Sequence, residues 1–154
     1  MGKNEIIEND LGWERIKRET EALSGRAVKV GIQSDAGEVA ERAFYNEFGT
    51  RGGASGGGWG GPIPARPFIS SAFEENRNDL HQMKARLWDG VLIGRLDANR
   101  AAGLLGEHHQ NQVREKITSI DSPPNSPVTT DMKGSSNPLI DTGEMRLSVR
   151  YEVE

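Results

Sequence analysis

The chain has 154 residues, a formal net charge of −4 and no cysteine. This length suits one domain with a core of its own. The acidic balance argues against a general nucleic-acid binder, which presents a basic face, and the lack of cysteine excludes disulfides and thiolate metal sites. Only 34% of the residues are apolar and 19 are glycine. We therefore expect a modest core with extended segments, no membrane span and no cofactor.

The first third of the chain predicts a helix, a strand and a second helix. Apolar residues recur at helical spacing over residues 5–24, and Gly25 provides a stop. Residues 28–32 alternate apolar and non-apolar positions, as a half-buried strand does. Residues 34–38 fit a capping box that opens a second helix, which Gly49 ends.

A glycine tract and a proline hinge follow. The stretch from Gly52 to Gly61 is mostly glycine around Trp59, and no Gly-Lys-Ser/Thr follows it, so a phosphate-binding loop is not favoured. We expect residues 51–62 to form a mobile loop in the free chain. Trp59 either anchors that loop on a partner or packs back on its own domain. Arg66 lies between two prolines that stiffen its backbone, which suits either a structural salt bridge or an intersubunit contact.

The rest of the chain predicts two helices, a second loop and a last strand. Apolar residues recur at helical spacing over residues 67–88 and again over residues 95–118. Residues 119–138 are rich in Pro, Ser, Thr and Asn, which predicts a long loop. From residue 147 to residue 153, apolar and polar side chains alternate, and this is the clearest strand pattern of the sequence.

No catalytic or metal-binding constellation stands out. The histidines are His81, His108 and His109, and adjacent positions of a helix do not share a face, so the last two do not favour one metal ion. The serines and threonines of residues 119–136 lack a nearby histidine base. The sequence favours a protein that is not an enzyme, and a small metal-dependent hydrolase is a distant alternative.

Three short segments carry the strongest pattern, and each is a backbone device: a helix stop, a stiff hinge and a turn that launches a strand. They are Glu47–Gly49, Pro64–Phe68 and Leu139–Gly143. Together they resemble the neck and tail-completion proteins of long-tailed bacteriophages, the group that includes the virion-morphogenesis protein G of phage Mu. The resemblance spans residues 26–153. The family's Glu-Phe-Gly, Pro-x-Arg-Pro-Phe and Leu-x-Asp-Thr-Gly motifs fall on Glu47–Gly49, Pro64–Phe68 and Leu139–Gly143.

The resemblance implies a structural virion protein of the phage head–tail junction. Such a protein forms a ring of identical subunits, six by the symmetry of phage tails, that helps to join the filled head to the tail. Its expected partners are itself and the neighbouring neck, portal-adaptor or tail-terminator proteins, with no specific nucleic acid and no membrane. It would be made in the host bacterial cytoplasm and would act in the virion. The alternatives are a tail-terminator or adaptor ring subunit and an assembly factor that is absent from the mature virion.

We expect an α+β fold in which residues 28–32 and 147–153 share one small antiparallel or mixed sheet. Two or more helices cover this sheet, and long extended loops leave it. Residues 1–25 form an N-terminal helix, and residues 26–154 form a single domain. The candidate interface residues are Phe48, Gly49, Trp59, Arg66, Pro67, Phe68, Asp141, Thr142, Gly143, Arg150 and Tyr151.

Overall fold

The structure is a computed structural model that describes residues 10, 12–51, 62–134, 136–139 and 143–154. Trp59, Asp141, Thr142 and residues 1–9 lie outside these residues, whereas Asp10 and Gly12 are described and are not helical, so the N-terminal helix begins later than predicted. The elements in chain order are α1 (Trp13–Ser24), β1 (Val28–Ile32), the 3₁₀ helix η1 (Ser34–Ala36), α2 (Glu38–Phe48), α3 (Phe68–Glu75), α4 (Arg77–Leu92), α5 (Ala98–Ser119), α6 (Pro127–Lys133), α7 (Glu144–Leu147) and β2 (Val149–Val153).

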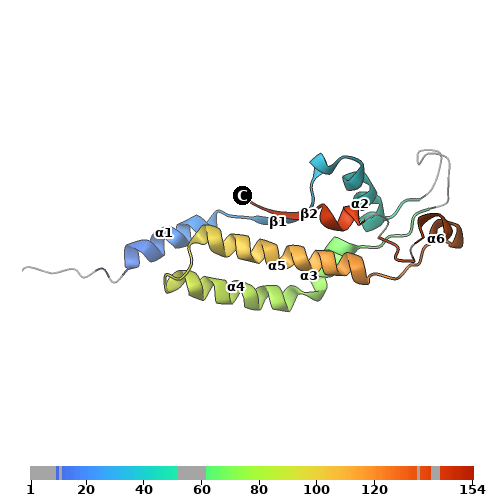
Figure 1. The fold of residues 1–154 in the computed structure, drawn as a ribbon. Helices are drawn as coiled ribbons and strands as arrows, with labels where there is room; N and C mark the ends of the chain where they lie inside the picture. Colours follow the sequence, from blue (N-terminus) through green and yellow to red (C-terminus); the bar gives the residue numbers. More distant parts are fainter. Residues whose placement is uncertain (1–9, 11, 52–61, 135, 140–142) are drawn as a thin grey trace, which may run out of the picture.

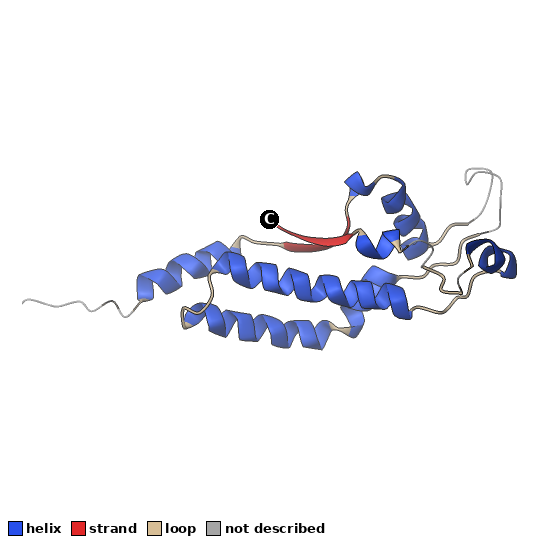
Figure 2. Cartoon of the chain, in the orientation of Figure 1, coloured by secondary structure: helices blue, strands red, loops and turns tan. Residues whose placement is uncertain are grey.

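The long helix α5 is the axis of the molecule. It packs against both strands, α1, α3, α4 and α7, and Figures 1 and 2 show it lying between the two-stranded sheet and α4. Figure 1 also places α2, α6 and α7 together at the end where α5 finishes. Asp97 caps the start of α5 by accepting a hydrogen bond from the Arg100 N–H at 2.8 Å. The predicted class, a small sheet packed against helices, is confirmed.

The sheet joins two segments that are far apart in the sequence. β1 and β2 pair antiparallel, with Val28 opposite Val153 and Ile32 opposite Val149. Pairing of these two segments was predicted from their alternation, and the structure confirms it. The side chains of Val30, Ile32 and Val149 pack into the core. One face of the sheet is therefore buried on the helices, as the pattern of the sequence requires.

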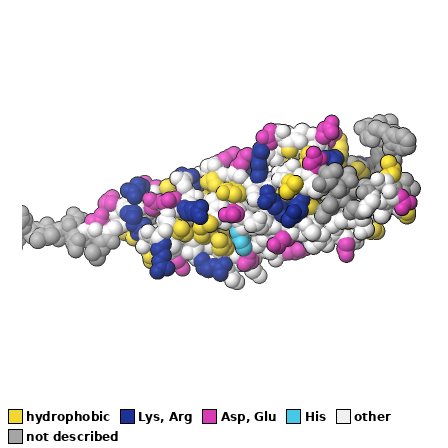
Figure 3. Space-filling view, viewed as in Figure 1, with side chains coloured by type: hydrophobic (Ala, Val, Ile, Leu, Met, Phe, Trp, Pro, Cys, Tyr) yellow, Lys and Arg dark blue, Asp and Glu magenta, His cyan; other side chains and the backbone are white. Residues whose placement is uncertain are grey.

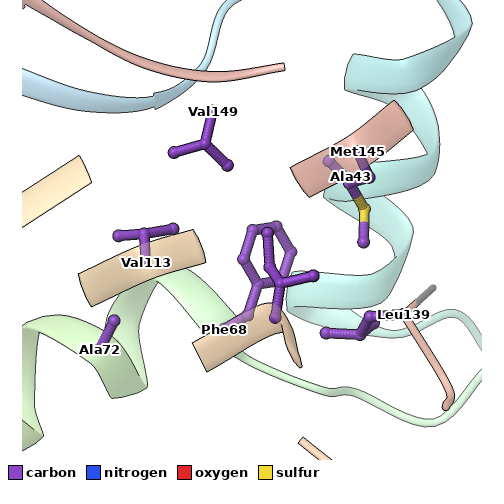
Figure 4. Packing of buried hydrophobic residues seen from close by; sticks show 8 residues of the cluster. Ala43, Phe68, Ala72, Val113, Leu139, Met145 and Val149 are labelled. Atoms are coloured by element: carbon purple, nitrogen blue, oxygen red, sulfur yellow. The ribbon is translucent and has the colours of Figure 1, made fainter. Parts of the chain in front are cut away.

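The core forms two clusters along α5. Phe68, Val113, Ile117 and Val149 are fully buried in the larger cluster. Figure 4 shows side chains from α2, α3, α5 and the C-terminal elements converging on Phe68 there. The smaller cluster centres on Val91 between α4 and α5. Figure 3 shows acidic and basic side chains interspersed over one face of the molecule, with no region of a single sign.

The N-terminal helix is attached to the same body. Arg15 donates to the carbonyls of Val91 and Leu92 at 2.8 and 2.7 Å, and the Glu19 carboxylate accepts from the Ala98 N–H at 2.9 Å. These bonds satisfy carbonyls at the end of α4 and an N–H at the start of α5 that have no partner within their own helices. No residue of α1 is fully buried, but Leu23 of its apolar stripe packs against the cluster of Val91.

Two predicted helix boundaries are wrong. The helix over residues 67–88 breaks at Asn76, because the Asn76 side chain also bonds the Ala72 carbonyl, at 2.8 Å, and competes with the helical ladder. The capping box at residues 34–38 does not form. Instead, Gly37 with φ 57° separates η1 from α2, and the Asp35 carboxylate bonds Arg150 rather than a helix N–H.

The C-terminal third also departs from prediction. The expected loop over residues 119–138 contains α6, whose N-cap Ser126 accepts from the Thr129 N–H. The last strand begins at Val149, and residue 147 belongs to α7. Met145 has to enter the core, where it is 8% exposed, and a helical turn delivers it there. The segment after Gly143 is therefore a short helix rather than the direct start of a strand.

Candidate functional site

Glu47 is the centre of a joint between α2 and α3. It is 8% exposed, and its carboxylate accepts from the Ile69 N–H at 2.9 Å and from the Ser70 N–H at 3.0 Å. The Ser70 hydroxyl donates to the same carboxylate at 2.6 Å. A carboxylate at a helix N-terminus satisfies free N–H groups and meets the positive end of the helix dipole. Glu47 thus caps α3 from another helix.

Gly49 lets the chain turn from α2 into the hinge. Its φ is 71°, a region that favours glycine, and an added Cβ would lie 2.9 Å from both the Ala65 nitrogen and the Ile63 oxygen. Beside it, the Thr50 N–H donates to the Ile63 carbonyl at 2.9 Å. The Ile63 N–H donates back to the Thr50 hydroxyl at 3.0 Å. These contacts bring together Thr50 and Ile63, which flank the glycine tract, and require a residue without a side chain at position 49.

Arg66 holds the third part of the joint. It is 4% exposed and donates from Nε to the Pro123 carbonyl at 2.6 Å and from Nη2 to the Pro124 carbonyl at 3.0 Å. Burial lowers the pKa of the Arg66 guanidinium from its ordinary value. No carboxylate pairs with Arg66 among the described residues, so the expected salt bridge is replaced by bonds to carbonyl oxygens. Arg66 fixes the loop within its own subunit.

The segment before the last motif is tied into the same region. Asn137 donates to the Thr118 carbonyl at 2.8 Å and accepts from the Leu139 N–H at 2.9 Å. Leu139 is 5% exposed and packs in the cluster of Phe68. Gly143, with φ 79°, then starts α7. The three motifs noticed in the sequence therefore meet in space through their described residues.

The joint corrects two of the interface candidates. Phe68 is fully buried at the centre of the core, and Arg66 is buried under the proline loop. In this structure neither side chain is available to a second molecule. Pro67 is the N-cap residue of α3 and is exposed. The role of the Pro-x-Arg-Pro-Phe segment is to fasten α2, α3 and the later loop to one another.

The exposed side chains beside this joint are apolar. Phe48 is 67% exposed and Phe44 is 59% exposed, and their ring centroids lie 4.8 Å apart. Phe48 also lines a shallow open pocket of about 440 Å³, and Ile63, 38% exposed, lines it as well. We call Phe44, Phe48 and Ile63 the aromatic patch. Exposed aromatic clusters of this kind are typical of surfaces that bind other proteins.

The two candidates on β2 lie on opposite faces of the sheet. Arg150 is on the exposed face and bonds both oxygens of Asp35, at 2.6 and 2.7 Å. The hydrogen bond from Arg150 lowers the pKa of Asp35, and the same bond raises the pKa of Arg150. Tyr151 faces α5, where its ring occupies the space that a side chain at Gly106 would need.

Two of the three histidines, His108 and His109, make hydrogen bonds on α5. Nε2 of His108 lies 2.5 Å from Oδ2 of Asp79, which joins α5 to α4. Gln112 donates to the same oxygen at 2.7 Å and contacts His109 at 3.0 Å. Asp79 has a lowered pKa, chiefly because of the hydrogen bond from His108. Across the described part of the chain, no three His, Cys, Asp or Glu side chains gather in a way that could hold a metal ion.

Comparison with known proteins gives no relative. No family model, no curated protein and no solved structure matches this chain. Among the described residues, no helix is long and apolar enough to cross a membrane. The motifs and the surface that they expose are therefore the basis for an assignment.

Proposed function

We propose that this chain is a structural protein of the phage head–tail junction and that it forms a ring of identical subunits there. The observation that carries the proposal is the convergence of the three motif segments in one joint. Motifs that are separate in the sequence and linked in space form a structural unit. Its chemistry is that of positioning: a helix cap, a glycine turn and an arginine that holds a loop.

The aromatic patch is the surface that this joint would present to the assembly. Phe44 and Phe48 lie one turn apart on α2, so both rings face the same side. Aromatic residues are enriched among the few interface residues whose truncation costs about 2 kcal/mol or more of binding energy. A ring contact is heterologous, so this patch would meet a different patch on the neighbouring subunit.

Electron microscopy of phage particles made without this protein tests the proposal. We expect filled heads lying beside free, complete tails. Normal joined particles, or heads that are empty because packaging fails, would contradict it. The copy number in washed particles distinguishes the alternatives, because a ring subunit remains in a fixed number, six by our proposal, whereas an assembly factor is lost.

The double variant Phe44→Ser/Phe48→Ser tests the patch itself. Both side chains are exposed, so we expect the free energy of unfolding to stay within about 0.5 kcal/mol of the wild-type value. We expect a large fall in the yield of joined particles. Met132→Ser is the matched control, since Met132 is 84% exposed on α6 and lies outside the patch. Equal yields from the double variant and the control would remove the patch from the proposal.

A further inference from the structure

The two outer edges of the sheet differ in whether their backbone groups are hydrogen-bonded. On β2, the Tyr151 N–H donates to Oε1 of Gln110 at 3.0 Å, and the Val149 carbonyl accepts from Nη2 of Arg114 at 2.8 Å. Gln110 and Arg114 both belong to α5. Side chains of the central helix thus bond two backbone groups on the outer edge of β2.

The outer edge of β1 is open. Ala27 and Glu154 exchange two backbone hydrogen bonds, at 3.0 and 2.9 Å. This bonded pair determines which residues of β1 direct their backbone groups toward β2. In an antiparallel pair the bonded residues alternate, so Val28, Val30 and Ile32 direct their N–H and C=O groups away from β2. Within the described residues, nothing forms a hydrogen bond with these six backbone groups. Native proteins normally cover, pair or break such an edge.

We propose that the open edge of β1 pairs with β1 of a second copy of this chain, antiparallel about a twofold axis. The two sheets would then become one sheet of four strands in the order β2–β1–β1–β2. On β2 two outward groups are bonded by α5, whereas the described residues leave all six outward groups of β1 unbonded, so two copies that pair through this edge meet through the same surface. This is an isologous contact, and it extends a two-stranded sheet that is marginal alone.

The side chains of β1 fit this pairing in one register. With Val30 opposite Val30 of the second copy, Lys29 lies opposite Gly31, and no like charges meet. Moving the centre to Lys29 would place two lysines opposite each other, which is unfavourable. Ile69 lies 3.7 Å from the position of a Cβ on Gly31, so the aliphatic stem of Lys29 from the second copy has an apolar neighbour. The three apolar residues of each β1 extend the buried face.

A proline placed at position 28 tests the edge without breaking the fold. The Val28 N–H points outward, so its loss removes no bond of the β1–β2 ladder, and proline is tolerated at such edge positions. Val153→Pro is the matched control, because Val153 lies directly opposite Val28 and its N–H points to the other edge. Both side chains are partly exposed.

Sedimentation equilibrium of the purified full chain is the measurement. We expect the wild type and Val153→Pro to dimerise equally, and Val28→Pro to raise the dimer Kd by roughly tenfold or more, since two of six intermolecular bonds are lost. A wild type that stays monomeric at high protein concentration, or a Val28→Pro chain that dimerises normally, would overturn the proposal.

Hydrogen exchange of the wild type gives a second readout, which is needed if Val28→Pro fails to fold. Amides of Val30 and Ile32 should become protected as the protein concentration rises, and those of Lys29 and Gly31 should be protected at all concentrations. Protection that does not depend on concentration would also overturn the pairing. The twofold pair is proposed for the free chain in solution and is separate from the ring contact proposed above, which uses a different surface and is tested in particles.

Discussion

Single residues of the joint provide hydrogen-bond partners to backbone groups that would otherwise have none. We expect Glu47→Ala to destabilise the fold by about 2 kcal/mol or more, because the N–H groups of Ile69 and Ser70 would lose their acceptor. Urea denaturation gives the free energy of unfolding. Glu38→Ala is the control, since Glu38 is exposed on the same helix. Equal stability of the two variants would mean that Glu47 does not cap α3.

Two glycines of α5 allow a paired test at the same scale. A Cβ at Gly106 would lie 2.4 Å from the Tyr151 ring, whereas a Cβ at Gly103 would lie 3.6 Å from the Tyr151 hydroxyl, an ordinary contact. We expect Gly106→Ala to cost about 1 to 3 kcal/mol through overpacking. Gly103→Ala should gain up to about 1 kcal/mol from helix propensity. If thermal unfolding showed that both substitutions stabilise the protein, or that both destabilise it, this account would be contradicted.

At the scale of elements, the ion pair of Asp35 and Arg150 ties η1 to β2. The pKa of Asp35 is lowered from its ordinary value of 3.8, so the pair stabilises the fold above that pH and the effect is lost as the pH falls through the lower folded pKa. We expect Asp35→Asn to lower Tm slightly at pH 6 and to approach the wild type as the pH falls through the lowered folded pKa of Asp35. Arg150→Gln should remove the same pH dependence. A Tm difference that persists in acid would contradict the pairing.

The elements also separate what a sequence can predict from what it cannot. Alternation predicted both strands and their pairing, because a half-buried sheet requires it. Ser126 followed by Pro127 is a cap signal that lay inside the predicted loop, so α6 could have been found. The break at Asn76 comes from a local bond between its side chain and the Ala72 carbonyl, which the spacing of apolar residues does not reveal. The helical turn at Met145 depends on tertiary contacts, and no local pattern contains it.

The same limit holds for the site. The Glu-Phe-Gly and Pro-x-Arg-Pro-Phe segments were recognised as important, and the role of Gly49 as a helix stop was predicted correctly. Their mutual contacts could not be predicted, since Arg66 meets the carbonyl of Pro124 58 residues away. The local sequence does not tell whether an arginine is buried or exposed. Phe68 was accordingly placed on a surface, although it fills the core.

At the scale of the whole molecule, the position of the sheet bears on the order of folding. β1 and β2 are more than 110 residues apart in the sequence, and closing so long a loop costs several kcal/mol of chain entropy, on the order of (3/2)RT ln n plus a constant. The contacts among α3, α4 and α5 are closer in sequence and can form first. The sheet would then form late, on a scaffold of helices that has already brought its two strands together.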